Sequence, residues 1–162
     1  MVTTELKPAH LRRIKSLALL SESQLESFLR HVSVVQFAQS QVIFKEGASG
    51  DSMFLILEGQ VRVFSKQKSG EMLFLRLLEA GDAFGEVALL NRGPRSASVE
   101  ATRGTLLLRI SASSLNGLMA EEPVVAGQFL YHLSRSLGRQ LADLTKRLRL
   151  GREVRDIVGF VQ

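Results

Sequence analysis

The chain of 162 residues contains no cysteine and only three histidines. Without cysteine, neither a disulfide framework nor a cysteine-ligated metal can form, and one reason to expect an oxidising compartment is removed. His10, His31 and His132 lie on three separate segments with helical patterns. A metal-dependent oxygenase or isomerase would need clustered histidine and carboxylate ligands on neighbouring strands, so this class of enzyme is not expected.

Long apolar runs are also missing. No segment approaches the ~20 apolar residues of a membrane span. The N-terminus has Glu5, Lys7 and Pro8 before its first apolar stretch, and so lacks the continuous apolar region of a signal peptide. The chain has no lysine-containing phosphate loop and no nucleophile beside a base. We therefore expect a cytoplasmic protein with no membrane partner, no catalytic residues, no metal and no cofactor.

The net charge is +5, and basic residues gather in the last quarter of the chain. Such a cluster suits nucleic acid or acidic partners, but no aromatic residues interleave with it as stacking platforms. We interpret it as a solvated helical face. Its members are Arg135, Arg139, Lys146, Arg147, Arg149, Arg152 and Arg155.

The middle of the chain is typical of many short antiparallel strands. From residue 34 to 110, runs of Val, Ile, Leu and Phe are separated by glycines. Ser69-Gly70 is expected at a hairpin tip between strands at 61–64 and 72–78, because glycine supplies the positive backbone dihedral of such turns. Helical spacing over 9–20 and 22–31, with Ser21 or Ser23 as a cap, predicts an N-terminal pair of helices. The fold class expected is α+β: an antiparallel, jelly-roll-like β-roll between helices.

After Pro123 the apolar residues recur at steps of mostly three and four, which predicts one long helix. Gly138 lowers the helix propensity by up to about 1 kcal/mol relative to alanine, so we expect a close contact or a bend there. The apolar stripe is longer than packing on the roll requires. It comprises Phe129, Leu130, Leu133, Leu137, Leu141, Leu144 and Leu148.

The segment 85–97 joins a carboxylate, a guanidinium and a short apolar run in one loop. Gly85 lets the backbone approach a ligand closely, and Glu86 to Leu90 are expected to form about a turn of helix with amide groups available to an anion. Arg95 offers a planar fork of donors for a phosphate. Glu86 would be repelled by that phosphate unless it accepts a hydrogen bond from a nearby sugar hydroxyl. A 3′,5′-cyclic nucleotide, with one phosphate charge and a free 2′-hydroxyl, meets both conditions.

The wider sequence supports this ligand. Phe84-Gly85-Glu86-Val87-Ala88-Leu89-Leu90 and Pro94-Arg95-Ser96-Ala97-Ser98-Val99 closely resemble the phosphate-binding cassette of cyclic-nucleotide-binding domains, the family of bacterial cAMP receptor proteins and eukaryotic kinase regulatory subunits. Upstream, residues 42–47, 51–63 and 81–86 resemble the early strands of this family and its entry to the cassette. The resemblance implies one domain over 1–162: N-terminal helices to 33, a roll over 34–112 with the cassette at 84–99, C-terminal helices over 113–150, and a tail at 151–162.

The resemblance also implies that the purine reaches toward the long helix. Gln140 and Leu141 stand where the bacterial members have a Thr-Ser pair, and Gln140 can both donate and accept a hydrogen bond. Arg76 resembles an arginine that contacts guanine in a cGMP-selective kinase site, whereas Ser96 matches the bacterial cAMP receptors. We favour cAMP over cGMP. The candidate ligand-binding residues are Gly85, Glu86, Val87, Ala88, Arg95, Ser96, Ala97, Val63, Leu75, Arg76 and Gln140, with Val99 as a further apolar wall.

The function expected is that of a non-catalytic sensor that binds a cyclic nucleotide and signals through its C-terminal helix. The family resemblance implies a homodimer through that helix, and the output then needs an effector protein. Residues 151–162 are too few for a helix-turn-helix domain, so binding to DNA by that route is not expected. They form a linker or, through Val158, Phe160 and Val161, a lid over the base. The alternatives are a structural scaffold without a ligand, or the sensor domain of a longer protein.

Overall fold

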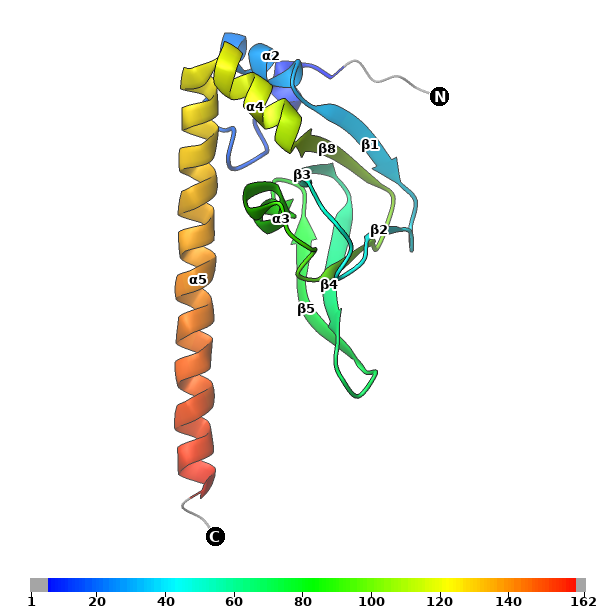
Figure 1. Ribbon diagram of the computed structural model, residues 1–162, viewed down its shortest axis with the longest axis vertical. Helices are drawn as coiled ribbons and strands as arrows, with labels where there is room; N and C mark the ends of the chain where they lie inside the picture. Colours follow the sequence, from blue (N-terminus) through cyan, green and yellow to red (C-terminus); the bar gives the residue numbers. More distant parts are fainter. Residues whose placement is uncertain (1–5, 160–162) are drawn as a thin grey trace.

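The computed structural model describes the backbone of residues 6–159 and the side chains of residues 6–150. Its centre is a β-roll of two four-stranded sheets in which every strand pair is antiparallel, so the predicted fold class is confirmed (Figure 1). The first sheet has the order β1 (Ser33–Phe37), β8 (Thr105–Ser111), β3 (Ser52–Glu58), β6 (Ala83–Phe84). The second has the order β2 (Val42–Phe44), β7 (Ser98–Ala101), β4 (Gln60–Lys66), β5 (Met72–Glu79).

Strand β3 shows why the roll has two apolar cores. All but the last of its residues are buried, because it lies between the opposite sheet and the helices. Successive side chains of a strand point to opposite faces. Phe54 and Ile56 accordingly join the core between the sheets, together with Val61 and Val99. The residues Met53, Leu55 and Leu57 join the second core, which attaches the helices to the roll.

The N-terminal region has the predicted pair of helices, but the first is shorter than expected. Helix α1 covers only Pro8–Leu11, and residues 12–20 form turns, so the expected extent of a helix over 9–20 is wrong. The apolar residues Leu11, Ile14, Leu17 and Leu20 are spaced by three and are buried, and each of the last three donates its backbone N–H to the carbonyl of the one before. A step of three suits turns with bonds between residues i and i+3 rather than an α-helix.

The second helix, the hairpin and the short cassette helix follow the sequence prediction. Helix α2 (Glu22–Leu29) is capped at its N-terminus by Ser21, whose side chain accepts from the backbone N–H of Gln24 in a capping box. The turn between β4 and β5 contains Gly70 at φ +91°. Helix α3 (Glu86–Asn91) starts directly after Gly85, which has φ +82°.

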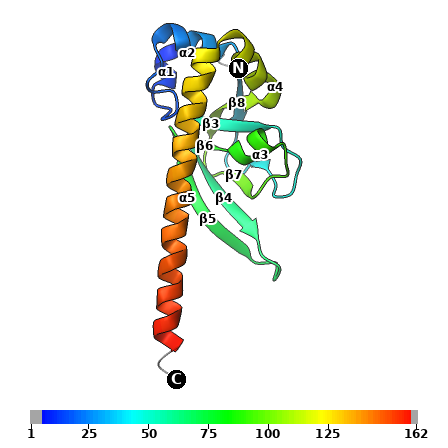
Figure 2. The same ribbon diagram turned by 60° about the vertical axis from the view of Figure 1, so that its left-hand side comes forward.

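Two helices follow the roll, α4 (Ala112–Glu121) and the long α5 (Pro123–Gly159) (Figures 1 and 2). The start of α5 packs on the second core through Phe129 and Leu133, whereas further along Leu141, Leu144 and Leu148 are 66%, 54% and 63% exposed. Within the described helices, no stretch is long and apolar enough to cross a membrane.

The structure differs from the expectation of a close contact or a bend at Gly138. A Cβ placed there would meet no atom within 4 Å among the described residues, apart from the backbone of its own helix, and the helix passes through it without a bend (Figure 1). The tail was expected to be either a linker or a lid, and the backbone of residues 151–159 has the arrangement of a linker, because it continues α5 and extends away from the roll (Figure 1). The other two apolar residues of that predicted lid, Phe160 and Val161, lie outside the described residues.

Candidate functional site

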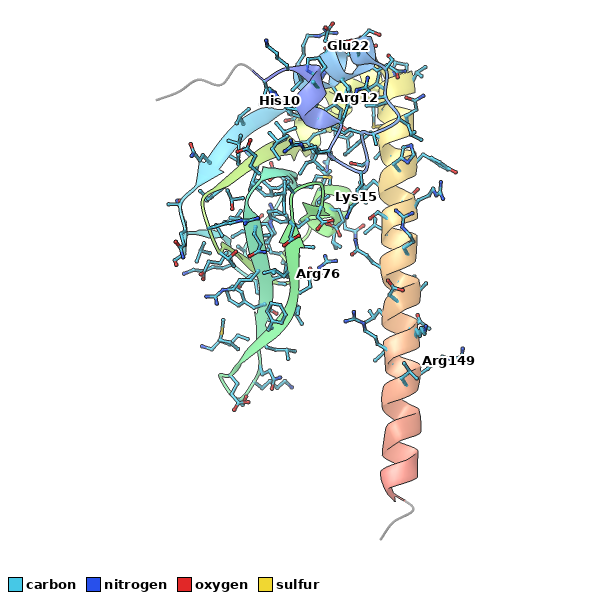
Figure 3. The ribbon with its side chains drawn as sticks, turned by 180° about the vertical axis from the view of Figure 1, so that it is seen from behind. His10, Arg12, Lys15, Glu22, Arg76 and Arg149 are labelled. Atoms are coloured by element: carbon cyan, nitrogen blue, oxygen red, sulfur yellow. The ribbon has the colours of Figure 1, made fainter. Side chains whose placement is uncertain are left out.

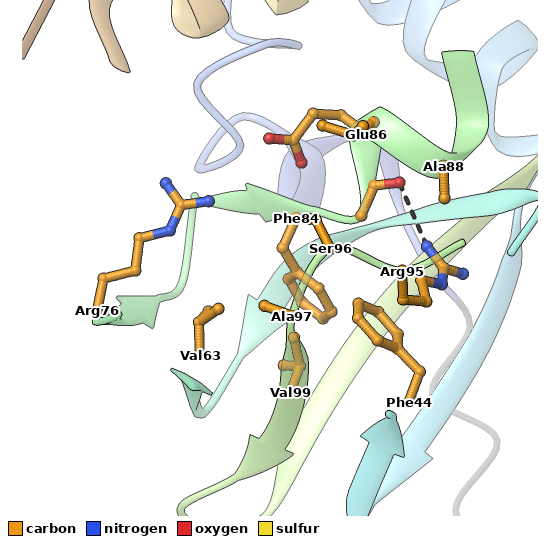
Figure 4. Close-up of a pocket in the computed structure, with 12 residues that line it drawn as sticks. Phe44, Val63, Arg76, Phe84, Glu86, Ala88, Arg95, Ser96, Ala97 and Val99 are labelled. Carbon is orange, nitrogen blue, oxygen red and sulfur yellow. Dashed lines mark hydrogen bonds between the residues drawn. The ribbon is translucent and has the colours of Figure 1, made fainter. Parts of the chain in front are cut away.

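The loop after β6, helix α3 and the start of β7 form one wall of a pocket in the roll (Figure 4). Strands β2, β4 and β5 supply the other walls. This pocket brings together nearly all of the side chains that the sequence predicted for a ligand. Its lining residues are Phe44, Val63, Arg76, Phe84, Gly85, Glu86, Val87, Ala88, Arg95, Ser96, Ala97 and Val99.

Glu86 is the first residue of α3 and is only 5% exposed. Its Oε2 atom is buried and has no hydrogen-bond partner among the described residues. A buried carboxylate oxygen without a donor is costly, because burial removes it from water without replacing the lost hydrogen bonds. Glu86 therefore presents an unused acceptor at the wall of the pocket.

Arg95 lies opposite, 6% exposed, and its guanidinium is held by backbone and aromatic groups. Nη1 donates to the carbonyl of Ser52 at 2.6 Å, and Nη2 donates to Ser52 Oγ at 3.2 Å. Nη1 also donates to the carbonyl of Gly85 at 3.3 Å, the bond that Figure 4 draws. The guanidinium carbon lies 4.1 Å from the centre of the Phe44 ring. No carboxylate forms an ion pair with Arg95 among the described residues.

The electrostatic setting of Arg95 favours an anion. Desolvation by burial lowers the pKa of Arg95 from its usual value; the charge of Asp51 acts in the opposite direction, and Arg109 lowers the pKa further. Because a guanidinium stays protonated at neutral pH, the cation is buried with incomplete compensation. Its Nε atom is also buried without a partner in the described part of the chain. An anion in the pocket would offset this cost.

Two glycines make room for that guanidinium. A Cβ on Gly50 would lie 2.4 Å from Arg95 Nε, and one on Gly85 would lie 2.8 Å from Nη1. Gly85 also requires a positive φ, which few other residues adopt. The sequence reasoning did not assign roles to Gly50, Ser52 or Phe44. The only local signals were the stretches 42–47 and 51–63, which contain Phe44 and Ser52, because the contacts to Arg95 cross long sequence separations.

Arg76 on β5 and Gln140 on α5, the two candidates for the base, lie next to each other. Arg76 Nη1 donates to Gln140 Oε1 over 2.8 Å, and Arg76 extends from the roll toward the long helix (Figure 3). Gln140 does not line the pocket itself. It lines a cleft between α5 and the roll that also includes Arg76, Ser16 and Asp143.

Leu75 is the one predicted wall residue that the structure does not bring to the site. It is 42% exposed and is absent from the pocket lining, so its selection as an apolar wall is wrong. The cause is a register shift between β4 and β5. Val63 pairs with Arg76 and Phe64 with Phe74, which leaves Leu75 without a partner in the register. Alternation along a regular strand could not reveal this bulge.

Comparison with known proteins identifies the family of the chain. The family model for the cyclic nucleotide-binding domain matches residues 34–122. The chain belongs to this family.

Among curated proteins, the chain is 32% identical over 143 residues to a cyclic AMP receptor protein of Thermus thermophilus, an alignment that covers 87% of this chain and 64% of that protein. It is 36% identical over 114 residues to a cGMP-dependent protein kinase, isozyme 1, of Drosophila melanogaster, covering 68% of this chain and 15% of the kinase. The chain thus spans less than two thirds of the length of these relatives.

Solved structures show the same architecture. A catabolite activator protein of Thermus thermophilus matches with a TM-score of 0.75 at 30% identity, covering 84% of this chain and 62% of that one. A cyclic nucleotide-binding domain from Methylobacillus flagellatus matches with a TM-score of 0.79 at 22% identity, covering 86% of this chain and 83% of that one. The second likeness supports the fold alone.

Proposed function

We propose that this protein is a non-catalytic sensor that binds a 3′,5′-cyclic nucleotide, with cAMP as the favoured ligand. The observation that carries the proposal is that Glu86 and Arg95 line the same pocket, where Glu86 Oε2 has no hydrogen-bond partner among the described residues. One site thus offers a buried cation and a buried hydrogen-bond acceptor, and the contacts that each makes offset only part of the cost of its burial.

A cyclic nucleotide would compensate both groups. Its phosphodiester carries one negative charge, which a single guanidinium can balance without a metal. Its ribose 2′-hydroxyl is a donor close to that charge, and Glu86 would accept from it. Ser96, whose side chain is exposed at the pocket, would add a hydroxyl for the phosphate. Gly85, Val87, Ala88 and Ala97 would surround the ribose phosphate.

cGMP is the second candidate. Arg76 lines the pocket and presents only donors, whereas guanine presents the acceptors O6 and N7. The likeness to the Drosophila kinase supports this ligand, and the likeness to the Thermus receptor supports cAMP. Ser96 favours cAMP through its resemblance to the bacterial receptors.

The output of the sensor would pass through α5. Binding shifts a conformational equilibrium only if the ligand favours one arrangement of the helix, and the bond from Arg76 to Gln140 offers such a contact. The exposed Leu141, Leu144 and Leu148 support pairing of α5 with a second copy in a homodimer. An effector protein would read the change. The absence of cysteine is consistent with a cytoplasmic setting.

Isothermal titration with cAMP, cGMP and cyclic dinucleotides tests the proposal. We expect heat and thermal stabilisation with cAMP, and a much weaker effect of 5′-AMP. The latter has the same base and ribose, but its phosphate carries a second charge and is not closed into a cyclic phosphodiester. If none of the cyclic nucleotides produces heat or a thermal shift up to millimolar concentration, the alternative of a scaffold without a ligand replaces the sensor.

A further inference from the structure

His31, which follows α2 directly, connects this helix to the end of α4. Its Nε2 atom lies 3.1 Å from Oε2 of Glu121, and its Nδ1 atom lies 3.0 Å from the carbonyl oxygen of Ser27. Glu121 is the last residue of α4, and α5 begins two residues later at Pro123. The helices α2 and α4 are therefore joined at the place where α5 starts (Figures 1 and 2).

Both ring nitrogens of His31 face hydrogen-bond acceptors. A backbone carbonyl oxygen can only accept, and so can an ionised carboxylate. A neutral imidazole has one N–H group and can satisfy only one of these two partners, whereas the imidazolium has two N–H groups and satisfies both. Only 9% of the His31 side chain is exposed, so water has little access to replace a missing bond. The contact as the structure has it therefore requires the protonated ring.

The charged groups beside His31 come from both helices. Arg30 Nη2 and Glu122 Oε1 form an ion pair at 3.3 Å, and Ser27 Oγ donates to Glu122 and accepts from Arg30, each over 2.9 Å. These two opposite charges offset each other, and neither side chain bonds to the His31 ring in the described part of the chain. Glu121, 69% exposed, is thus the carboxylate that balances a charge on the ring.

We propose that His31, with Ser27 and Glu121, forms a proton-dependent latch between α2 and α4. With the ring protonated, both hydrogen bonds form and the latch is closed. When the ring loses its proton, a nitrogen lone pair meets an acceptor, and the contact with either Glu121 or Ser27 is lost. Histidine is the side chain that ordinarily changes its charge between about pH 5 and 8. The latch thus makes the anchoring of α4, and of the start of α5, depend on pH.

Thermal unfolding of the full chain without ligand, between pH 6 and pH 8.5, tests the latch. The latch stabilises the fold only while the ring is protonated, so its contribution is present at low pH and is lost as the pH rises. The melting temperature of the unmodified protein should exceed that of His31→Gln most at pH 6. We expect this difference to shrink by about 2–4 °C towards pH 8.5, the size that one modest interaction produces in a chain of this length. Lost packing adds a constant offset, so a difference that does not shrink overturns the proposal.

Two further variants sharpen the test. Glu121→Gln supplies an amide NH₂ group, which can donate to Nε2 of a neutral ring while Nδ1–H still donates to Ser27. This variant should be less stable than the unmodified protein at pH 6 but not at pH 8.5, and a deficit that persists at pH 8.5 contradicts the latch. His10→Gln is the matched control. His10 Nδ1 accepts the backbone N–H of Lys7 at 3.1 Å and so needs no proton, and its difference from the unmodified protein should not shrink as the pH rises.

Nitrogen-15 NMR of the His31 ring gives a readout that does not depend on how well the variants fold. In the unmodified protein we expect both ring nitrogens to carry protons at pH 6 and only one at pH 8.5. A ring with a single N–H group at pH 6 overturns the latch. Neither measurement includes a nucleotide, so a failure of the latch leaves the proposed sensor function standing, and a failure to bind cyclic nucleotides leaves the latch standing.

Discussion

Replacement of Glu86 by glutamine should make the protein more stable and a weaker binder at the same time. Glu86 is 5% exposed and its Oε2 atom has no donor among the described residues. A neutral amide of nearly the same shape is less costly to bury than a carboxylate. Glu86→Gln should therefore raise the free energy of unfolding when no ligand is added.

The size of the effect follows from the cost of an unsatisfied buried group, about 1–3 kcal/mol. Since the amide also lacks partners, we expect the lower end, about 1 kcal/mol. For a chain of this size that raises the melting temperature by about 2–4 °C. A hydrogen bond to a neutral acceptor is weaker than one to a charged acceptor by roughly 1 kcal/mol, so affinity for cAMP should fall by about a factor of five to ten.

Thermal unfolding with and without cAMP, combined with calorimetric titration, measures both effects. Glu100→Gln is the control: Glu100 is also largely buried, but it accepts from Arg62 at 2.9 Å, so its replacement should lower the melting temperature and leave affinity unchanged. A lower melting temperature of Glu86→Gln together with unchanged affinity would refute the role of Glu86 as an acceptor kept for the ligand.

Other positions give further tests. Arg95→Lys should weaken cAMP binding at least tenfold in calorimetry, because lysine has no planar fork of donors, and normal binding would contradict the phosphate assignment. Gly50→Ala should reduce affinity similarly, since its Cβ would lie 2.4 Å from Arg95 Nε. Leu144→Asp should dissociate the proposed homodimer in analytical ultracentrifugation. Val124→Asp should not, although Val124, near the start of α5, is even more exposed than Leu144. Removal of residues 151–162 should leave the affinity for cAMP unchanged, because the described part of this segment extends α5. A loss of affinity would instead support the alternative that the tail acts as a lid over the base.

The roll was predicted correctly because short-range patterns in the sequence indicate its strands and turns. Glycines between short apolar runs predict strands, and Ser69-Gly70 predicts a turn with a positive φ, as the structure has at Gly70. The same reasoning failed where local patterns are ambiguous. A spacing of three residues over 11–20 suits both a helix and a series of turns, and the turns form because they bury all four apolar side chains against the helical core.

The sequence by itself determined the cassette, since Glu86 and Arg95 are joined by a short loop whose glycine and apolar run can form only a few structures. Only the tertiary structure decided which contacts these groups make. The missing partner of Glu86 Oε2, the contacts of Arg95 with Ser52 and Phe44, and the bond from Arg76 to Gln140 all depend on how distant segments pack. Hydrogen bonds require positions within a few tenths of an ångström, and sequence patterns specify which face a residue occupies but not such distances.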